Sequence, residues 1–168
     1  DAGLLAGSMP RTVKDALSDL YAQGATFLPA VEADEALTAA GYGILKGDSL
    51  AGWAEGDAAL GVNLVLGQVD DVVELPLDGG GVAALRVVGA RTSVRPVMDG
   101  GALTGLSLTC TLDANMAEGN LDLRTEEVHA SLEAALAQVE EARIRSALEL
   151  AQELDADYLG LLRRAALA

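Results

Sequence analysis

The pattern of apolar positions predicts one short helix near the amino terminus, within the segment 12–24. Its apolar residues lie three and four positions apart: Val13, Ala16, Leu17 and Leu20. This spacing places them on one face of a helix, and Gly24 suits the left-handed conformation at which helices often end. We therefore expect a short amphipathic helix that begins near Thr12.

Strand-like segments follow this helix. Segments 25–32 and 36–45 are separated by an acidic run typical of an exposed turn, and they are expected to pair as a hairpin. Residues 54–66 fit either a strand or a short helix, and we favour the helix. Residues 69–77 alternate between apolar and polar and predict a strand, and the Asp-Gly-Gly-Gly run at 78–81 predicts a tight turn after it.

The clearest strand signal comes from the middle of the chain. Segment 82–98 is long for a strand, so Gly89 near its centre indicates a bulge or bend, and Pro96, which has no amide donor, indicates a sheet edge. After a turn at 99–101, apolar and polar residues alternate. The apolar set is Leu106, Leu108, Cys110 and Leu112. This alternation is typical of a strand with one buried face.

A long amphipathic helix is predicted over 125–155. Thr125 suits the N-cap position, and acidic residues follow it in the first turn. The apolar stripe comprises Val128, Leu132, Leu136, Val139, Ala147, Leu150 and Leu154. A helix of this length measures roughly 45 Å. A break at 155–157 is expected before a final turn or short helix over 158–167.

Together these elements predict an α+β fold. We expect a mainly antiparallel sheet of four to five strands, covered by the long C-terminal helix, with the short N-terminal helix beside it. The 168 residues are enough for one ordinary domain. We expect a terminal tail over 1–11 and a single domain over 12–168.

Charge and composition narrow the classes of partner. The chain has 26 acidic and 11 basic residues, for a formal charge of -15, which repels nucleic-acid phosphates and anionic lipid head groups. Nucleic acid and direct electrostatic membrane binding are therefore not expected. Nothing at the amino terminus resembles a signal peptide, so any targeting segment is expected to be missing from this chain. The single Cys110 can form no internal disulfide and falls short of a cysteine zinc site.

No motif in the sequence clearly indicates a catalytic, cofactor-binding or metal-binding site. The glycines in 41–47 do not have the spacing that a dinucleotide-binding loop requires. Segment 113–124 resembles a calcium-binding loop, but two of the required residue types are not at their positions. His129 is the only histidine, and we expect it to be exposed or at an interface; Cys110 is expected to be a small buried residue. Trp53 is expected in the core, although an exposed Trp53 would be an interface anchor. We therefore expect no catalytic, cofactor-binding or metal-binding residues.

One stretch, GYGILKGDSLAGWAEGDAALG, is similar to a family pattern in which a strand leads through a Lys-Asp-x-Leu turn into a short helix. The matching residues are Gly41, Lys46, Asp48, Leu50, Gly52 and Gly61. The likeness continues in VMDGGAL and in LDADYLGL, whose matching residues are Asp157, Tyr158 and Gly160. On these motifs, from about Thr12 to Leu162, the chain resembles the C-terminal domain of the Ger(x)C family of spore-germination receptor C subunits. The tail RRAALA departs from the family's basic and aromatic ending.

The resemblance implies a lipoprotein subunit on the outer face of the spore inner membrane. It would act with two integral-membrane subunits, A and B, as a receptor for nutrient germinants, with its lipid-bearing cysteine upstream of Asp1. The family carries no known catalytic residue to transfer. We therefore expect a non-catalytic domain that acts in receptor assembly and docking, and the motif residues above are expected to be structural or to lie at an interface.

Two other classes remain as alternatives. One is a secreted small-molecule-binding domain with a pocket beneath the long helix. The other is an enzyme, which is less favoured because the general base, metal cluster and nucleophile are missing or solitary.

Overall fold

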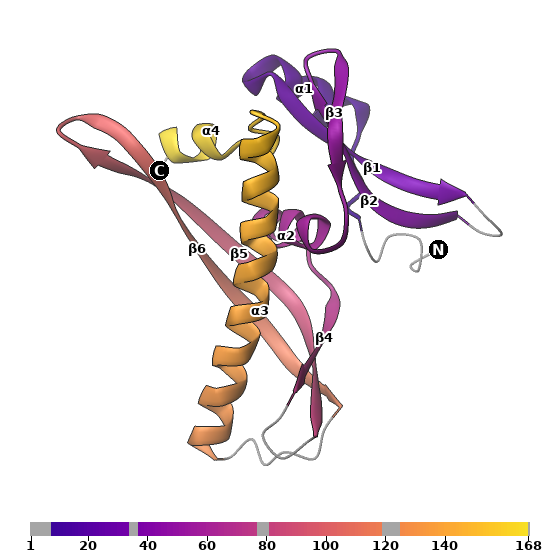
Figure 1. Cartoon of the computed structure of the whole chain (residues 1–168), viewed down its shortest axis with the longest axis vertical. Coiled ribbons are helices and arrows are strands. Elements are labelled where there is room, and N and C mark those ends of the chain that lie inside the picture. The colour runs from indigo at the N-terminus through magenta and orange to yellow at the C-terminus, as the bar shows by residue number, and fades with distance from the viewer. Residues whose placement is uncertain (1–7, 34–36, 77–80, 119–124, 168) are drawn as a thin grey trace.

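The structure is a computed structural model and describes residues 8–33, 37–76, 81–118 and 125–167. Its described elements form two three-stranded antiparallel sheets and four helices, and the long helix α3 stands upright at the centre (Figure 1). The first sheet lies near the upper end of α3, and the second sheet crosses behind its middle.

The first sheet follows a capped helix. Its elements are α1 (Val13–Gln23), β1 (Ala25–Ala33), β2 (Leu37–Lys46) and β3 (Ser49–Ala54), with strand order β1-β2-β3. Thr12 and Asp15 form a reciprocal capping box at the start of α1, and Gly24 ends the helix with a φ of 74°. β1 and β2 pair from Ala25 with Lys46 to Ala33 with Leu37, as the expected hairpin.

The second sheet contains the two longest strands. Its elements are α2 (Gly56–Leu66), β4 (Asp71–Pro76), β5 (Val82–Asp99) and β6 (Ala102–Glu118), with strand order β4-β5-β6. The β5–β6 register shifts between Val87 and Gly89, which confirms the bulge expected at Gly89. β4 pairs only as far as Val87, so the part of β5 that contains Pro96 pairs with β6 alone among the described strands.

The long helix α3 (Glu126–Glu153) is followed by α4 (Leu161–Ala166). Acidic residues occupy the first turn of α3, as expected, although the Thr125 side chain makes no capping hydrogen bond. Asp155 has a φ of 47° and therefore marks the expected break after the helix. α3 packs closely on α2 and crosses the face of the second sheet (Figure 1).

The buried side chains form two clusters. The first cluster joins the first sheet, α2, the second half of α3 and α4, and its largest members are Phe27, Tyr42, Ile44 and Tyr158. The second cluster holds the first half of α3 against β4 and β5 through Leu132, Leu136, Val73, Leu75, Leu85 and Val87. Buried apolar area of this kind is the main force that stabilises a fold.

The α+β class is confirmed, but the expected single sheet of four to five strands is wrong. β3 was not predicted, because its residues 49–54 contain a glycine, Gly52, and little alternation. The alternation of side chains predicts strands but not their partners. Here α2 leads the chain away from the first sheet, so β4 begins a second one.

Two further expectations, for Trp53 and for the N-terminal tail, differ from the structure. Trp53 is 53% exposed and not in the core, because it lies on the outer face of β3 above Gly43, which has no side chain to cover it. Ser8 and Met9, from the expected tail, are buried against the core. The turn expected at 78–81 and the calcium-loop positions Gly119 and Arg124 lie wholly or largely outside the described residues.

Candidate functional site: the surfaces around the long helix

Three of the family-motif residues meet at the C-terminal end of α3. Lys46 Nζ lies 3.0 Å from the Asp155 carboxylate and 3.4 Å from the Leu154 carbonyl oxygen. A Cβ at Gly52 would lie 3.0 Å from a methyl carbon of Leu154, so β3 approaches the helix end closely. Asp157 follows directly and accepts hydrogen bonds from the first backbone N–H groups of α4. These residues join the first sheet to α3 and α4.

Two motif glycines permit close packing of backbones. A Cβ at Gly61 would lie 2.1 Å from the Arg143 carbonyl oxygen, so only glycine lets α2 approach α3 this closely. Gly41 has a φ of 87°, and a Cβ there would lie 2.1 Å from the Ala54 carbonyl oxygen. Glycine is required at both positions by the close approach of backbones, and not by a chemical role.

Tyr158 fixes the chain that returns after α3. Its ring is fully buried, and its hydroxyl donates a 2.9 Å hydrogen bond to the Ala147 carbonyl oxygen in α3. Burial raises the pKa of the Tyr158 hydroxyl above its ordinary value, so it stays protonated as the donor. Gly160 has a φ of 66° and begins α4. By contrast, Asp48 and Leu50 lie exposed around the β2–β3 turn and contribute to the surface.

A cluster of one guanidinium and three carboxylates lies between α2, β4 and α3, and the sequence patterns did not reveal it. Arg143 Nη1 lies 3.0 Å from both the Asp71 and the Glu140 carboxylates, and its Nε lies 3.6 Å from Asp57. Glu140 is only 1% exposed, and its Oε2 has no hydrogen-bond partner among the described residues. Burial raises the pKa of Glu140, although Arg143 acts in the opposite direction. The cluster holds three elements together.

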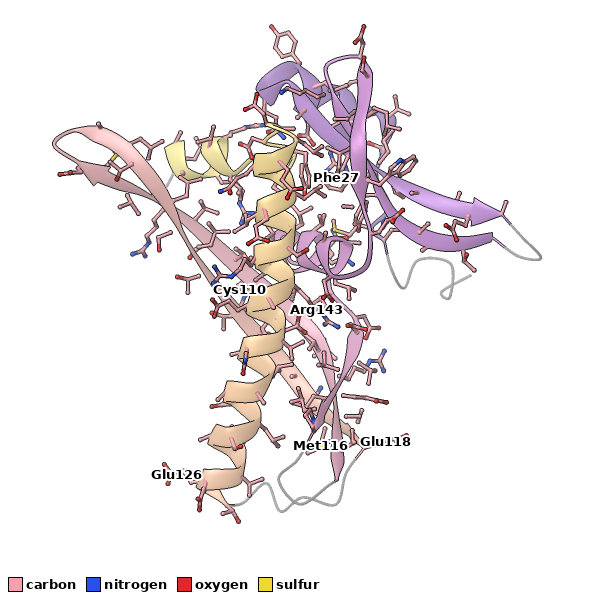
Figure 2. The ribbon with its side chains drawn as sticks, viewed as in Figure 1. Phe27, Cys110, Met116, Glu118, Glu126 and Arg143 are labelled. Carbon is pink, nitrogen blue, oxygen red and sulfur yellow. The ribbon has the colours of Figure 1, made fainter. Side chains whose placement is uncertain are left out.

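An open groove runs along the other side of α3, between α3 and β6, and we call it the α3–β6 groove. It consists of two adjoining hollows of about 470 and 620 Å³ that share Cys110, Leu112 and Ala137. In Figure 2, Cys110 lies on the opposite side of α3 from Arg143. The groove's walls are largely apolar, with acidic residues of α3 at the rim. Cys110 is half-buried there, and so is more accessible than expected.

The described residues that line the groove do not form a recognisable catalytic site. His129 is exposed as expected, and its Nδ1 lies 3.4 Å from Glu133 of the same helix face. Within the described ranges, no group of three or more His, Cys, Asp or Glu side chains is placed to hold a metal ion. The geometry instead offers apolar surface and backbone edges, which bind other molecules through burial and hydrogen bonds.

Three strongly exposed apolar side chains lie along α1. Val13, Leu17 and Tyr21 are 75%, 60% and 96% exposed, and they follow one another at intervals of four residues along the helix. We call these three residues the α1 stripe. The apolar spacing predicted that Val13, Ala16 and Leu17 share one apolar face, whereas in the structure Ala16 is buried and Val13 and Leu17 are exposed. The spacing from Leu17 to Tyr21 is the signal that could have identified a second apolar face.

A second exposed apolar surface lies on the first sheet. Leu28 pairs with Gly43 and Gly43 with Trp53, so both side chains share the outer face, and Leu50 also approaches Gly43. Leu28, Leu50 and Trp53 are all exposed, and we call them the Trp53 patch. Exposed apolar groups that gather in this way mark interaction sites more often than scattered ones.

The fold and these surfaces define an α+β domain whose exposed apolar groups suit contact with other molecules. The chain belongs to the family described as spore germination B3/GerAC like, C-terminal, whose sequence model matches residues 40–166. A search of curated proteins found no match.

A solved structure shares the fold. The chain is similar to the structure titled "Crystal Structure of the GerBC protein", with a TM-score of 0.67 and 16% sequence identity. The match covers 99% of this chain and 55% of that one, so this chain spans about half the length of the solved protein. No helix in the described part of the chain is long and apolar enough to cross a membrane.

Proposed function

We propose that this chain is a non-catalytic docking domain of a germinant receptor C subunit, acting in receptor assembly during spore germination. Its partners would be the integral-membrane A and B subunits of that receptor. Membership of the GerAC-like family supports the assignment to spore germination, and the shared fold with GerBC is consistent with it.

The observation that carries the docking role is the α1 stripe. Three large apolar side chains on one short helix stand in solvent, where each leaves apolar surface exposed to water that a partner would cover. Tyrosine in particular is enriched among the residues that contribute most to protein interfaces. A surface of this kind supports a role in contact with another protein.

The location follows from the same proposal. A lipid anchor on a segment upstream of this chain would hold the subunit on the outer face of the spore inner membrane, next to its partners. The charge of -15 supports an indirect attachment of this kind, because an acidic surface is repelled by anionic head groups.

The α3–β6 groove favours a second candidate, a small-molecule-binding domain. Its two hollows have the volume of ordinary ligand sites, but they are open along one side. Stabilisation of the protein by amino acids or other small germinants, measured as a rise in Tm, would favour this candidate. Stabilisation only by receptor subunits would favour docking.

The test of the docking role changes the α1 stripe in the complete receptor. Leu17→Lys and Tyr21→Lys add a charge where a partner would bury apolar surface, and we expect them to reduce co-purification of the A and B subunits at least about tenfold. Ser18→Lys, on an exposed neighbouring position of the same helix, is the matched control and should co-purify normally. Equal recovery with all three variants would contradict the role of the stripe.

A further inference from the structure

The outer edge of β6 has no strand partner among the described residues. β6 is the last strand in the order β4-β5-β6, and it is 17 residues long. Its register with β5 is regular from Gly105 to Asp113, because the bulges lie outside this stretch. In a regular antiparallel strand, every second residue directs its N–H and C=O groups away from its partner. This stretch therefore presents a regular row of backbone groups that have no strand partner among the described residues.

The long helix extends along this edge without covering it. The α3–β6 groove is lined by Leu108, Cys110 and Leu112 and also by the alternate residues Thr109, Thr111 and Asp113. Because both sets line it, the groove reaches around the edge of the strand. In Figure 2, Glu118 at the end of β6 and Glu126 at the start of α3 lie apart.

The dimensions of the groove match one extended segment. Its β6 wall runs from Leu108 to Met116, which spans roughly 27 Å at about 3.4 Å per residue. Its α3 wall runs from His129 to Leu148, which spans roughly 28 Å at about 1.5 Å per residue. An extended segment of about eight residues has the same length.

The charges around the groove select the chemistry of that segment. Glu133, Glu141 and Asp113 line it, as does Glu140, whose Oε2 is buried without a hydrogen-bond partner among the described residues. Arg145 is the one Lys or Arg among the described residues that line the groove, and it lies 2.7 Å from Glu141, so acidic groups remain in excess in the lining. An acidic rim around apolar walls favours a segment with apolar residues at alternate positions and basic residues beside them.

We propose that an extended segment of a partner protein, apolar at alternate positions and flanked by Lys or Arg, adds as a fourth strand to the outer edge of β6 beneath α3. This addition deepens the docking role and rests on it for the nature of the occupant, a partner protein. The new strand satisfies the free backbone groups of β6, and its inward side chains fill the apolar hollows. A second copy of this chain is the weaker occupant, because each copy carries a charge of -15.

The test uses a fluorescent probe peptide on the full chain. The peptide has eight residues, with valine and threonine alternating between a lysine at each end, and its binding is measured by fluorescence anisotropy. We expect saturable binding that weakens at least about tenfold when alternate backbone nitrogens on one edge are methylated, because those donors then cannot pair with β6. Glutamate in place of both lysines should also weaken binding. Equal affinity for the methylated peptide would overturn the proposal.

Two variants locate the site. Cys110→Lys places a charge inside the groove and should weaken binding at least about tenfold, whereas Ser107→Lys, on the exposed face of the same strand, should bind normally. Amide hydrogen exchange on the unchanged protein should slow within 108–113, the part of the regular strand that lines the groove, when the peptide binds. Slowing elsewhere, or a protein dimer in sedimentation that excludes the peptide, would contradict the proposal. Either result leaves the co-purification test of the α1 stripe unaffected, so the two claims fail separately.

Discussion

At the scale of single residues, the family motif is explained by packing more than by chemistry. Gly61 lets two helices touch, Tyr158 ties the returning chain to α3, and Lys46 pairs with Asp155 at the helix end. The charge cluster around the buried Glu140 and Arg143 joins three elements. Substitution of these residues should therefore change stability before it changes any binding.

Gly61→Ala is the sharpest test of helix packing. The added Cβ would lie 2.1 Å from a backbone oxygen of α3, so the helices must move apart, and we expect a loss of about 2 kcal/mol or more in the free energy of unfolding. Chemical denaturation measures this loss. Gly105→Ala is the matched control, because its Cβ would meet only Val97 at 4.0 Å, and it should change stability by less than about 0.5 kcal/mol. A fully stable Gly61→Ala protein would contradict the close packing.

Glu140→Gln tests the electrostatics of the buried cluster. Because the pKa of Glu140 is raised in the folded protein, the folded state binds this proton more tightly than the unfolded chain does. Stability should therefore fall as the pH rises above the ordinary Glu pKa of about 4.3, and Glu140→Gln should remove that part of the fall. Arg143 keeps Asp71 as a partner in the variant.

The measurement is the free energy of unfolding of both proteins between about pH 4 and pH 8, a range chosen around the ordinary Glu pKa. At pH 7 we expect Glu140→Gln to be at least as stable as the unchanged protein. The exposed neighbour Glu141→Gln is the control, and at pH 7 it should change the free energy of unfolding by less than about 0.5 kcal/mol, because an exposed ion pair contributes little. A large loss of stability at pH 7 in Glu140→Gln alone would show that the ionised carboxylate is needed.

At the scale of elements, α3 has two halves with different support. The second half packs on α2, receives the Tyr158 hydroxyl and belongs to the larger core cluster. The first half is held to the second sheet by Leu132 and Leu136 and leaves one flank open to the α3–β6 groove. Local stability follows the number of buried contacts, so the two halves should open independently.

Amide hydrogen exchange should resolve this difference. We expect exchange at least about tenfold slower in residues 140–153 than in residues 128–137, because the second half is buried on more sides. Tyr158→Phe removes the hydrogen bond to Ala147 and should speed exchange in the second half only. Uniform exchange along α3, before and after the substitution, would contradict the division.

The same elements show how much of the structure could be predicted from sequence. The α1, β1 and β2 segments, the bulge at Gly89 and the break near Asp155 were predicted, because local spacing and glycine determine them. The division into two sheets, the position of Trp53 and the Arg143 cluster were not. Each of these depends on contacts between segments distant in the chain, which periodicity does not encode.

At the scale of the whole molecule, two core clusters meet along α3. The α1 stripe and the Trp53 patch lie outside both clusters, whereas residues of both clusters form part of the walls of the α3–β6 groove. The α1 stripe and the Trp53 patch belong to the part built around the first sheet, and the α3–β6 groove belongs to the second. The central claim of the account is the proposed docking role, in which a receptor subunit covers the α1 stripe.

Photo-crosslinking in spores tests that claim most directly. A photo-reactive phenylalanine derivative replaces Tyr21 in the α1 stripe or, as the control, Ser18 on the same helix. We predict a crosslink from position 21 to a receptor subunit and a much weaker one from position 18, because a partner covers the stripe. Equal yields from the two positions, or no crosslinked receptor subunit from position 21, would contradict the account.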